Sequence, residues 1–290
     1  VVIFGRDAES LKDADIALAG ESMFIKGDVC SQDDLETLFR KTRNHFGTID
    51  IVVANAGGAI MQPFLEVTEE DFNYQSDVNF KGVFFTLQKA VPCMNDSGAA
   101  IIVSSSANCR AVPGMSVYGS AKAAVRALAR TLTQELAPRK IRVNVLTPGP
   151  VMTAAYSRTG LSEEEIADFQ ALQASQIPLK RIGQPDEIAA AALFLASSDS
   201  SFVAGAELVA DGLLAVLGPD LRHPYLGLLQ PYPSARNVSL ASRTGGSGTP
   251  RIHLRRRTVW WILHSNFRAS GCGCDRNLAR KTHPERAFAA

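Results

Sequence analysis

The sequence predicts an α/β fold built on a doubly wound parallel sheet with helices on both faces. Short apolar runs typical of strands alternate along the chain with longer segments that carry helix start and stop signals. Strands that alternate with helices form parallel sheets, because each connecting helix packs against the sheet. The 290 residues are 46% hydrophobic and 20% charged, so the chain has enough apolar surface for a core.

The expected strands are short apolar runs followed by turn residues, and they cover residues 1–4, 23–25, 51–53, 101–105, 141–146 and 207–210. Helices are expected over residues 8–20, 31–46, 68–92 and 117–137, with two more that begin at Ser162 and Pro185. Their starts carry capping signals, since Ser31 precedes two Asp residues and Ser162 forms a capping box with Glu165. Gly47 and Pro138 mark two of the helix ends.

The two parts of the chain differ in charge and composition. Residues 1–217 carry a net charge of −8, whereas residues 218–290 carry +9, with eleven Arg and one Lys among them. Pro and Gly residues interrupt the second part, which lacks a sustained helical or strand period. We therefore expect a domain boundary near Leu217, between an α/β domain over residues 1–217 and an Arg-rich, disordered tail over residues 218–290.

The composition gives no sign of a membrane or secreted protein. No run of about 18 apolar residues occurs, and the chain opens without a secretory signal. The five Cys are scattered, at positions 30, 93, 109, 272 and 274, and offer no disulfide framework. These features favour a reducing, cytoplasmic setting.

Tyr118 and Lys122 form a pair suited to proton transfer. They stand four residues apart in an expected helix, so the phenol and the ammonium lie on the same face. A nearby cation favours phenolate and lowers the pKa of the phenol, which can then give or take a proton at a carbonyl or alcohol oxygen. Ser105 ends an expected strand, at the edge where ligands bind in open α/β sheets. Taken singly, the pair is equally well explained as a surface pair, and Ser105 as a turn residue.

Together, Ser105, Tyr118 and Lys122 resemble the Ser and Tyr-x-x-x-Lys signature of the short-chain dehydrogenase/reductase family, whose domain is Rossmann-like. Ser105 is chosen over Ser104 and Ser106 because it lies thirteen residues before Tyr118, as in the family. The resemblance implies an oxidoreductase that transfers a hydride between a nicotinamide cofactor and a secondary alcohol or ketone of a small molecule. Tyr118 would be the general acid for reduction and the base for oxidation. Lys122 would lower the pKa of Tyr118 and hold the ribose hydroxyls, and Ser105 would bind the substrate oxygen.

Further segments resemble the parts of the family that hold the cofactor. Asp28 resembles the acidic residue that binds the adenine, Asn55-Ala56-Gly57 a segment beside the cofactor, and residues 148–153 the Pro-Gly segment at the nicotinamide. Asn79 resembles a fourth catalytic residue, which breaks its helix locally and holds a water linked to Lys122. Taken singly, most of these are ordinary turn or loop residues. The implied cofactor-binding set is Arg6, Asp28, Val29, Asn55, Ala56, Gly57, Tyr118, Lys122, Pro148, Gly149, Val151 and Thr153.

The residues after the first expected strand favour NADP over NAD. Family members that prefer NAD usually carry an acidic residue where this chain has Gly5, which binds the ribose 2′-hydroxyl. Arg6 follows instead and could pair with a 2′-phosphate. Asp7 stands one residue further on, so NAD is the alternative. No metal ligands are expected in the catalytic site.

The chain departs from the family at its amino end. The family's domain begins with a strand, a Thr-Gly-x-x-x-Gly-x-Gly turn and a helix, and that turn binds the pyrophosphate. No such turn precedes Val1, and the Gly-rich residues 245–248 follow no expected strand. We therefore expect either a gap in the sheet or direct pairing of the strands at Val1 and Ile51. The alternative to an active enzyme is a truncated, non-catalytic fragment or pseudoenzyme that no longer binds the dinucleotide.

Three interpretations of residues 218–290 stay open. The most favoured is solvated coil. The second is an arm that binds nucleic acid or an acidic surface, built on three consecutive Arg at residues 255–257 beside Trp260 and Trp261. The least favoured is a metal site, because the Cys-x-Cys spacing is not that of a zinc site. Its ligands would be Cys272, Cys274 and either His264 or His283.

The partner that the resemblance implies is a small-molecule alcohol or ketone. Residues 154–177, which cover the pocket in the family, mix apolar and polar side chains, so the substrate is expected to be partly apolar. Family members often assemble into tetramers, and we expect a homo-oligomer, either dimer or tetramer, formed through the helices over 68–92 and 117–137. The sequence predicts no membrane partner, and it does not favour nucleic acid.

Overall fold

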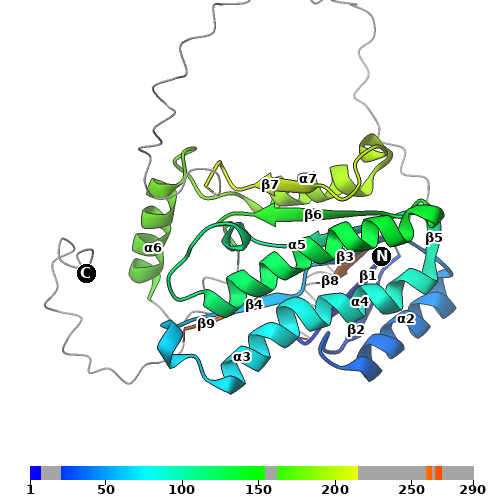
Figure 1. Ribbon diagram of the computed structural model, residues 1–290, viewed down its shortest axis with the longest axis horizontal. Coiled ribbons are helices and arrows are strands. Elements are labelled where there is room, and N and C mark those ends of the chain that lie inside the picture. The colour runs from blue at the N-terminus through cyan, green and yellow to red at the C-terminus, as the bar shows by residue number, and fades with distance from the viewer. Residues whose placement is uncertain (8–20, 154–161, 215–258, 263–264, 270–290) are drawn as a thin grey trace, which may run out of the picture.

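A seven-stranded parallel sheet forms the centre of the computed structural model (Figure 1), which describes residues 1–7, 21–153 and 162–214, and the backbone of 259–262 and 265–269. The strand order is β2-β1-β8-β3-β5-β6-β7, and every neighbouring pair runs parallel. Helices cover both faces of this sheet, which confirms the doubly wound α/β fold predicted from the sequence. Among the described residues, no helix is both long and apolar enough to cross a membrane.

The strands of this sheet are β1 (Val2–Gly5), β2 (Met23–Lys26), β3 (Ile49–Ala54), β5 (Met94–Val103), β6 (Arg142–Pro148), β7 (Glu207–Ala210) and β8 (Val259–Ile262). A separate parallel pair consists of β4 (Gly57–Met61) and β9 (Ser265–Ala269). The α-helices are α2 (Gln32–Phe46), α3 (Glu69–Ser76), α4 (Gly82–Ala90), α5 (Ser116–Leu136), α6 (Glu163–Gln176) and α7 (Pro185–Ala196). A π-helical segment, η2 (Asp77–Lys81), joins α3 to α4, and the 3₁₀ turn η4 (Ser106–Asn108) follows β5.

The side chains of β3 show how the two faces of the sheet are covered. Val52 and Ala54 belong to a core that also holds apolar residues of α2, α4 and α5. Ile51 and Val53 point to the opposite face and pack in a second core with residues of α7. This alternation follows from the two-residue period of a strand, and a strand buried on both faces is typical of parallel sheets.

The helix ends follow the capping signals of the sequence. The Ser31 hydroxyl accepts a hydrogen bond from the Asp34 N–H at 3.2 Å, and Gly47 ends α2 with a φ of +78°. The capping box of Ser162 and Glu165 is present at the start of α6. In place of the single helix expected over 68–92, the structure has α3 and α4, which the π-helical segment η2 separates. The helix expected over 8–20 lies outside the described residues.

The centre of the sheet differs from both arrangements expected from the sequence. The strands at Val1 and Ile51 neither face a gap nor pair directly, because β8 lies between them. Trp260 is in register with Val2 on one side and with Val52 on the other. The sequence of β8, Val-Trp-Trp-Ile, is apolar throughout, as is usual for a strand at the centre of a parallel sheet. Residues 218–290 therefore contain two strands that the sequence analysis did not predict.

Candidate active site

Ser105 and Tyr118 meet at the carboxyl edge of the sheet. β5 ends at Val103, and Ser105 caps the following 3₁₀ turn, its hydroxyl accepting a hydrogen bond from the Ala107 N–H at 3.2 Å. α5 begins at Ser116, which places Tyr118 in its first turn, and the phenol forms a side-chain hydrogen bond with Ser105. The two predicted site residues thus come together from separate elements. Part of the Tyr118 side chain stays exposed, while its hydroxyl is desolvated by the surrounding residues.

Lys122 lies one helical turn after Tyr118 and is enclosed, with 2% of its surface exposed. Its ammonium is 5.7 Å from the centre of the Tyr118 ring and donates a hydrogen bond to the Val103 carbonyl at 3.0 Å. Gly57 borders the same space. A β-carbon at this position would lie 3.1 Å from the Lys122 Nζ, so glycine permits the close approach of β4 to the ammonium.

Asn79 lies in η2 and is completely buried. Its amide exchanges two hydrogen bonds with the backbone of Gly58, accepting from the N–H at 3.1 Å and donating to the carbonyl at 2.6 Å. It also donates to the Gln75 carbonyl at 2.8 Å. The helix thus takes its π-helical form at the residue where the family resemblance implies a local break, and π-helical turns are frequent at functional sites.

Burial dominates the electrostatics of the pair. It raises the pKa of Tyr118, and the hydrogen bond with Ser105 opposes this shift only in part. Burial also lowers the pKa of Lys122 from its ordinary 10.5 to about 8. The sequence analysis expected a lowered pKa for Tyr118, and that direction is wrong here, because the desolvation of the phenol outweighs the interactions that favour phenolate. At neutral pH the phenol keeps its proton, which suits it to act as a proton donor.

The residues expected at the adenine end contact each other. The Arg6 Nη1 lies 3.5 Å from the Asp28 Oδ2, and both side chains are about one-third exposed. The other carboxylate oxygen of Asp28 accepts a hydrogen bond from the Cys30 N–H at 2.9 Å. Val29, in contrast, is a core residue. Its side chain packs so close to Gly82 that a β-carbon added to Gly82 would lie 2.9 Å from the Val29 Cγ2. The structure therefore brings Arg6 and Asp28 together and directs Val29 into the interior.

The segment 148–153 lies beside the end of β7. The Gly149 N–H donates to the Ala210 carbonyl at 3.1 Å, and a β-carbon at Gly149 would lie 2.7 Å from that of Asp211. Val151 forms a parallel bridge with Gly183. Thr153, at the end of the segment, is exposed. This part of the chain is thus held in place by backbone hydrogen bonds on both sides.

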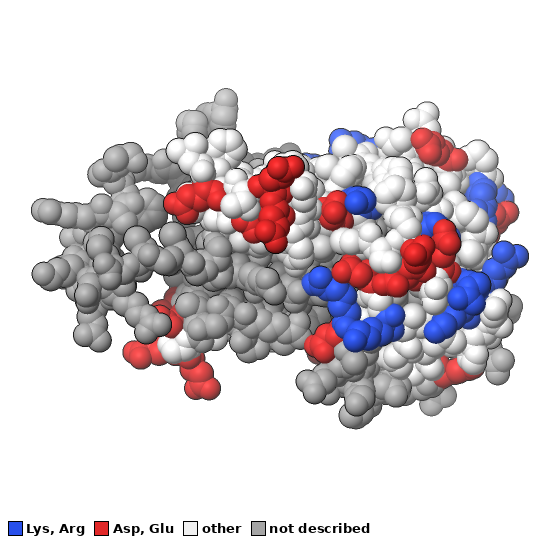
Figure 2. Space-filling model, turned by 90° about the horizontal axis from the view of Figure 1, so that it is seen from below, with Lys and Arg blue, Asp and Glu red and all other residues white. Residues whose placement is uncertain are grey.

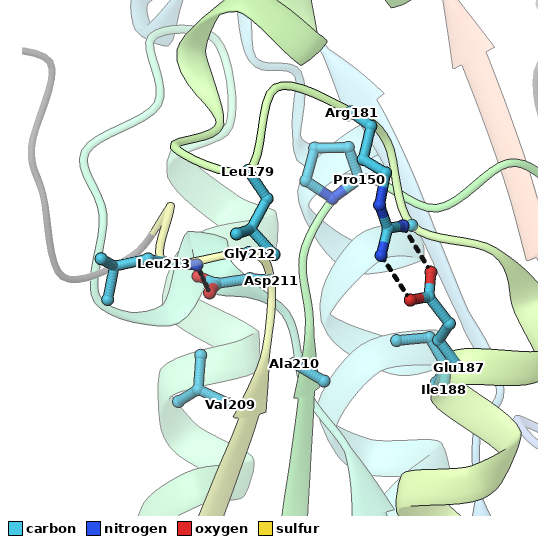
Figure 3. Close-up of a pocket in the computed structure, with 11 residues that line it drawn as sticks. Pro150, Leu179, Arg181, Glu187, Ile188, Val209, Ala210, Asp211, Gly212 and Leu213 are labelled. Atoms are coloured by element: carbon cyan, nitrogen blue, oxygen red, sulfur yellow. Dashed lines mark hydrogen bonds and ion pairs between the residues drawn. The ribbon is translucent and has the colours of Figure 1, made fainter.

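A pocket of about 300 Å³ is lined by Pro150 of this segment and by residues at the end of β7 and the start of α7 (Figure 3). On one wall, Arg181 and Glu187 form a double hydrogen bond at 2.6 and 2.7 Å, which lowers the pKa of Glu187 to about 2. The two charges of this pair neutralise each other, and Ser105, Tyr118 and Lys122 are not among the residues that line the pocket. Among the described residues, no group of three or more His, Cys, Asp or Glu is placed to hold a metal ion.

The sequence analysis missed a carboxylate that contacts the segments around Ser105 and Tyr118. Glu207 on β7 accepts hydrogen bonds from Asn108 and Thr147 and pairs with Arg126. The one signal in the sequence is a charged residue in a short, otherwise apolar strand, which by itself predicts only a solvated edge.

Residues 1–212 match the protein family described as enoyl-(acyl carrier protein) reductase. The chain is 41% identical over 217 residues to the oxidoreductase asL5 of Sarocladium schorii, covering 74% of this chain and 85% of that protein. It is 32% identical over 218 residues to the hydroxynaphthalene reductase-like protein Arp2 of Metarhizium brunneum, covering 71% and 80%. The crystal structure of a short-chain dehydrogenase/reductase of Brucella melitensis, described as a glucose/ribitol dehydrogenase, is similar with a TM-score of 0.68 and 32% identity, covering 73% of this chain and 85% of that chain.

Proposed function

The chain belongs to the short-chain dehydrogenase/reductase family of oxidoreductases, and from that premise we propose that it reduces a ketone of a small molecule, or oxidises the corresponding secondary alcohol, with NADP. The observation that carries this proposal is the hydrogen bond between Ser105 and Tyr118, with the Lys122 ammonium 5.7 Å from the Tyr118 ring. A protonated phenol paired with a second hydroxyl is suited to bind and protonate a carbonyl oxygen.

In the proposed reduction, Ser105 donates a hydrogen bond to the substrate oxygen and stabilises the negative charge that develops there. Tyr118 transfers its phenolic proton to the same oxygen, and the raised pKa of Tyr118 ensures that this proton is present at neutral pH. The cofactor, when bound, supplies the hydride that reaches the carbonyl carbon. In oxidation the proton moves in the opposite direction.

Lys122 and Asn79 support this step without contacting the substrate oxygen. The Lys122 ammonium, held by the Val103 carbonyl, stabilises the phenolate that Tyr118 becomes after proton transfer. Its place beside Gly57 also suits it to hold the ribose hydroxyls of the cofactor. Asn79 fixes Gly58 and thereby the segment next to the ammonium, and we propose that it holds the water through which protons reach the site.

The proposed cofactor set combines residues from both ends of the site. Asn55, Ala56, Gly57 and residues 148–153 would hold the nicotinamide end. The close approaches at Gly57 and Gly149 support this assignment, because both leave backbone free of side chains. Arg6, which follows β1 and lies beside Asp28, favours NADP, since a guanidinium binds a 2′-phosphate; NAD is the alternative.

The substrate class is proposed from the relatives. Because the chain is similar to a hydroxynaphthalene reductase-like protein, hydroxynaphthalenes and related cyclic ketones are the first compounds to test. The test is the oxidation of NADPH and of NADH by the full chain in the presence of such ketones. Turnover that disappears in Tyr118→Phe supports the proposal, and a rate that is the same in this variant contradicts it.

A non-catalytic role is the rival proposal, and a specific observation favours it. β8 leads into β9, which pairs with β4 so that Ser265 is in register with Gly57. β9 thus meets Gly57, the last residue of the segment 55–57 proposed to hold the cofactor, and runs along the residues that follow it. Fluorescence titration of NADPH into the full chain separates the two proposals, because an enzyme binds the dinucleotide and the rival does not.

We also propose that the protein is a cytoplasmic homo-oligomer, with residues 1–217 as its catalytic domain. Exposed aromatic side chains gather on the helices around η2, with Phe72, Phe80 and Phe84 each more than a third exposed. Apolar groups of this kind support assembly through α3 and α4. Among the described residues on the right part of the face in Figure 2, acidic and basic side chains are interspersed and form no continuous basic patch, which supports a small-molecule partner rather than nucleic acid.

A further inference from the structure

Glu207 connects three segments of the chain beneath the candidate active site. Its side chain is only 12% exposed. The Oε1 accepts hydrogen bonds from the Asn108 amide at 2.6 Å and from the Thr147 hydroxyl at 2.7 Å, and the Oε2 forms an ion pair with Arg126 at 2.5 Å. The three partners lie in η4, at the end of β6 and in α5.

Each of these segments carries residues of the proposed site. η4 begins directly after Ser105, which caps it. Thr147 precedes the segment 148–153 at the end of β6. Arg126 stands one helical turn after Lys122 in α5. One carboxylate therefore ties together the segments that present the catalytic hydroxyl, the catalytic helix and the proposed nicotinamide loop.

A second link runs from the same carboxylate to the backbone of Lys122. The Asn108 amide also donates to the Ser104 hydroxyl at 3.0 Å. Ser104 in turn donates to the Lys122 carbonyl at 2.9 Å. Both Ser104 and Thr147 are buried, so their hydrogen bonds have no competing contact with bulk water.

The largely buried position of this carboxylate needs a reason, because desolvating a charge is costly unless several donors compensate for it. β7 lies at the edge of the sheet, where a charged side chain could face solvent. Glu207 instead turns towards three donors from three elements. A network of this kind fixes side chains in one arrangement, which is what a catalytic geometry requires.

We propose that Glu207 is a positioning residue: its carboxylate holds η4, α5 and the end of β6 in the arrangement that brings Ser105, Tyr118 and Lys122 together. Its effect on catalysis rests on the proposed function, whereas its effect on the position of Lys122 does not. Lys122 is enclosed by the Val103 carbonyl, Gly57 and the Tyr118 ring, and Tyr118 is the titratable group among these neighbours.

The test compares three variants of the full chain. Glu207→Ala leaves the Asn108 amide and the Thr147 hydroxyl without their acceptor. Glu207→Gln keeps the oxygen that accepts from both, but it replaces the oxygen that faces Arg126 with an NH2 donor and so loses the ion pair with Arg126. Arg142→Ala is the matched control, because Arg142 binds the Leu195 and Ser197 carbonyls from the other end of β6. The measurements are thermal stability, kcat and KM, and the pKa of Lys122 from NMR of ¹³C-labelled lysine, assigned with Lys122→Met.

We expect Glu207→Ala to lower kcat by about 10- to 100-fold with little change in KM, because small displacements of reacting groups have effects of this size. The pKa of Lys122 should rise from about 8 towards its ordinary 10.5 as the ammonium gains access to water. Glu207→Gln should restore most of both properties. Arg142→Ala should lower the melting temperature and leave kcat and the Lys122 pKa unchanged.

Two other results distinguish a failure of the proposed function from a failure of the positioning role. If the unmodified chain turns over no ketone but the Lys122 pKa rises in Glu207→Ala, the proposed function fails and the positioning role stands. If the chain is active while neither kcat nor the Lys122 pKa changes in a folded Glu207→Ala, the positioning role is overturned. If Glu207→Ala does not fold, the positioning role is judged from Glu207→Gln alone. A folded Gln variant with the kcat and the Lys122 pKa of the unmodified chain supports the role of the hydrogen bonds. A folded Gln variant that has lost both properties overturns it.

Discussion

The two halves of the sheet are built in different ways. β5, β6 and β7 form one half from a continuous stretch of chain between Met94 and Ala210, with helices α5 and α7 on opposite faces. In the other half, β1 and β3 are separated by β8, a strand from residues 259–262. The first half holds Ser105, Tyr118 and Lys122, and the second holds Arg6 and Asp28 at the adenine end of the proposed cofactor site.

The comparison indicates that the proposed chemistry and the proposed nicotinamide end of the cofactor site depend on the first half, whereas the proposed adenine end depends on the second. The catalytic half relies on contacts that are close in the sequence or fixed by buried polar groups such as Glu207. The other half relies on β8, which is separated by a long stretch of sequence from β1 and β3. Closing the long loop that brings these strands together has a larger entropic cost. We therefore expect changes in β8 to weaken cofactor binding and stability, and changes in α5 to affect the reaction itself.

The largest effect is expected from Tyr118→Phe, which tests the catalytic half. Removal of the proton donor should lower kcat by about 10²- to 10⁴-fold, the usual contribution of a general acid. Tyr74→Phe in α3 is the matched control and should leave kcat unchanged. Steady-state kinetics with NADPH and a ketone provide the measurement. Equal losses in the two variants would show that the chemistry does not reside at Tyr118.

Trp260→Pro tests the other half, because proline removes the backbone N–H of Trp260 and does not fit a central strand. We expect the free energy of unfolding to fall by on the order of 3 kcal/mol, the size of a proline placed within regular structure. Trp260→Val keeps the N–H and a high strand propensity, so it serves as the control.

Hydrogen exchange measured residue by residue shows where the loss occurs. In Trp260→Pro, the amides of Val2–Phe4 and Ile51–Val53, which flank β8, should lose protection, while those of β6 and β7 keep it. Uniform loss over the whole sheet would contradict the distinction between the two halves. Unchanged protection beside β8 would show that this strand does not hold the centre of the sheet.

Lys122→Met separates stability from catalysis within the catalytic half. The folded-state pKa of Lys122 is about 8, below its ordinary 10.5, so the unfolded chain binds more protons between these values and stability rises with pH across this window. Lys122→Met should remove this rise. Its free energy of unfolding at pH 7 should exceed that of the unmodified chain by up to about 3 kcal/mol, since each pKa unit corresponds to about 1.4 kcal/mol. It should also be slower in turnover.

Denaturant unfolding at several pH values measures this effect. Lys89→Met is the control, because Lys89 forms an ion pair with an exposed Glu36 and contributes little to stability. A pH dependence of stability that is the same in Lys122→Met and in the unmodified chain would refute the burial of the Lys122 charge.

The smallest effect is expected at the adenine end. Arg6→Ala should lower kcat/KM for NADPH by about tenfold, the loss of one charge-assisted hydrogen bond, and change kcat/KM for NADH by less. Arg43→Ala in the exposed part of α2 is the control. If both cofactors are affected equally, Arg6 does not select the 2′-phosphate, and a preference for NADH in the unmodified chain would contradict the assignment of NADP.

What the sequence could predict depended on how local the relevant interaction was. The spacing of Tyr118 and Lys122 and the place of Ser105 after a strand are local properties, and the structure brings the three side chains together. The caps at Ser31 and Ser162 are local as well. The pKa of Tyr118 is raised rather than lowered, because the burial of its hydroxyl depends on residues far along the chain. Glu207 was missed for the same reason, since its donors come from three other elements.

The centre of the sheet shows the limit of pattern analysis most clearly. A four-residue apolar run such as 259–262 is too short to identify as a strand by period, and its surroundings are rich in Arg. The sequence analysis considered a gap between β1 and β3, but no local signal indicates that residues 259–262 fill it. β4 was missed because its Gly57-Gly58 start is typical of a turn.

The most direct test of the account is a single-turnover experiment on the full chain, with saturating NADPH and a ketone substrate, as a function of pH. We predict hydride transfer at neutral pH whose rate declines as the pH rises through about 8, where Lys122 loses its proton and no longer stabilises the Tyr118 phenolate. Absence of hydride transfer at saturating NADPH, or a rate that does not change through this pH, would contradict the proposal that Ser105, Tyr118 and Lys122 carry out a carbonyl reduction.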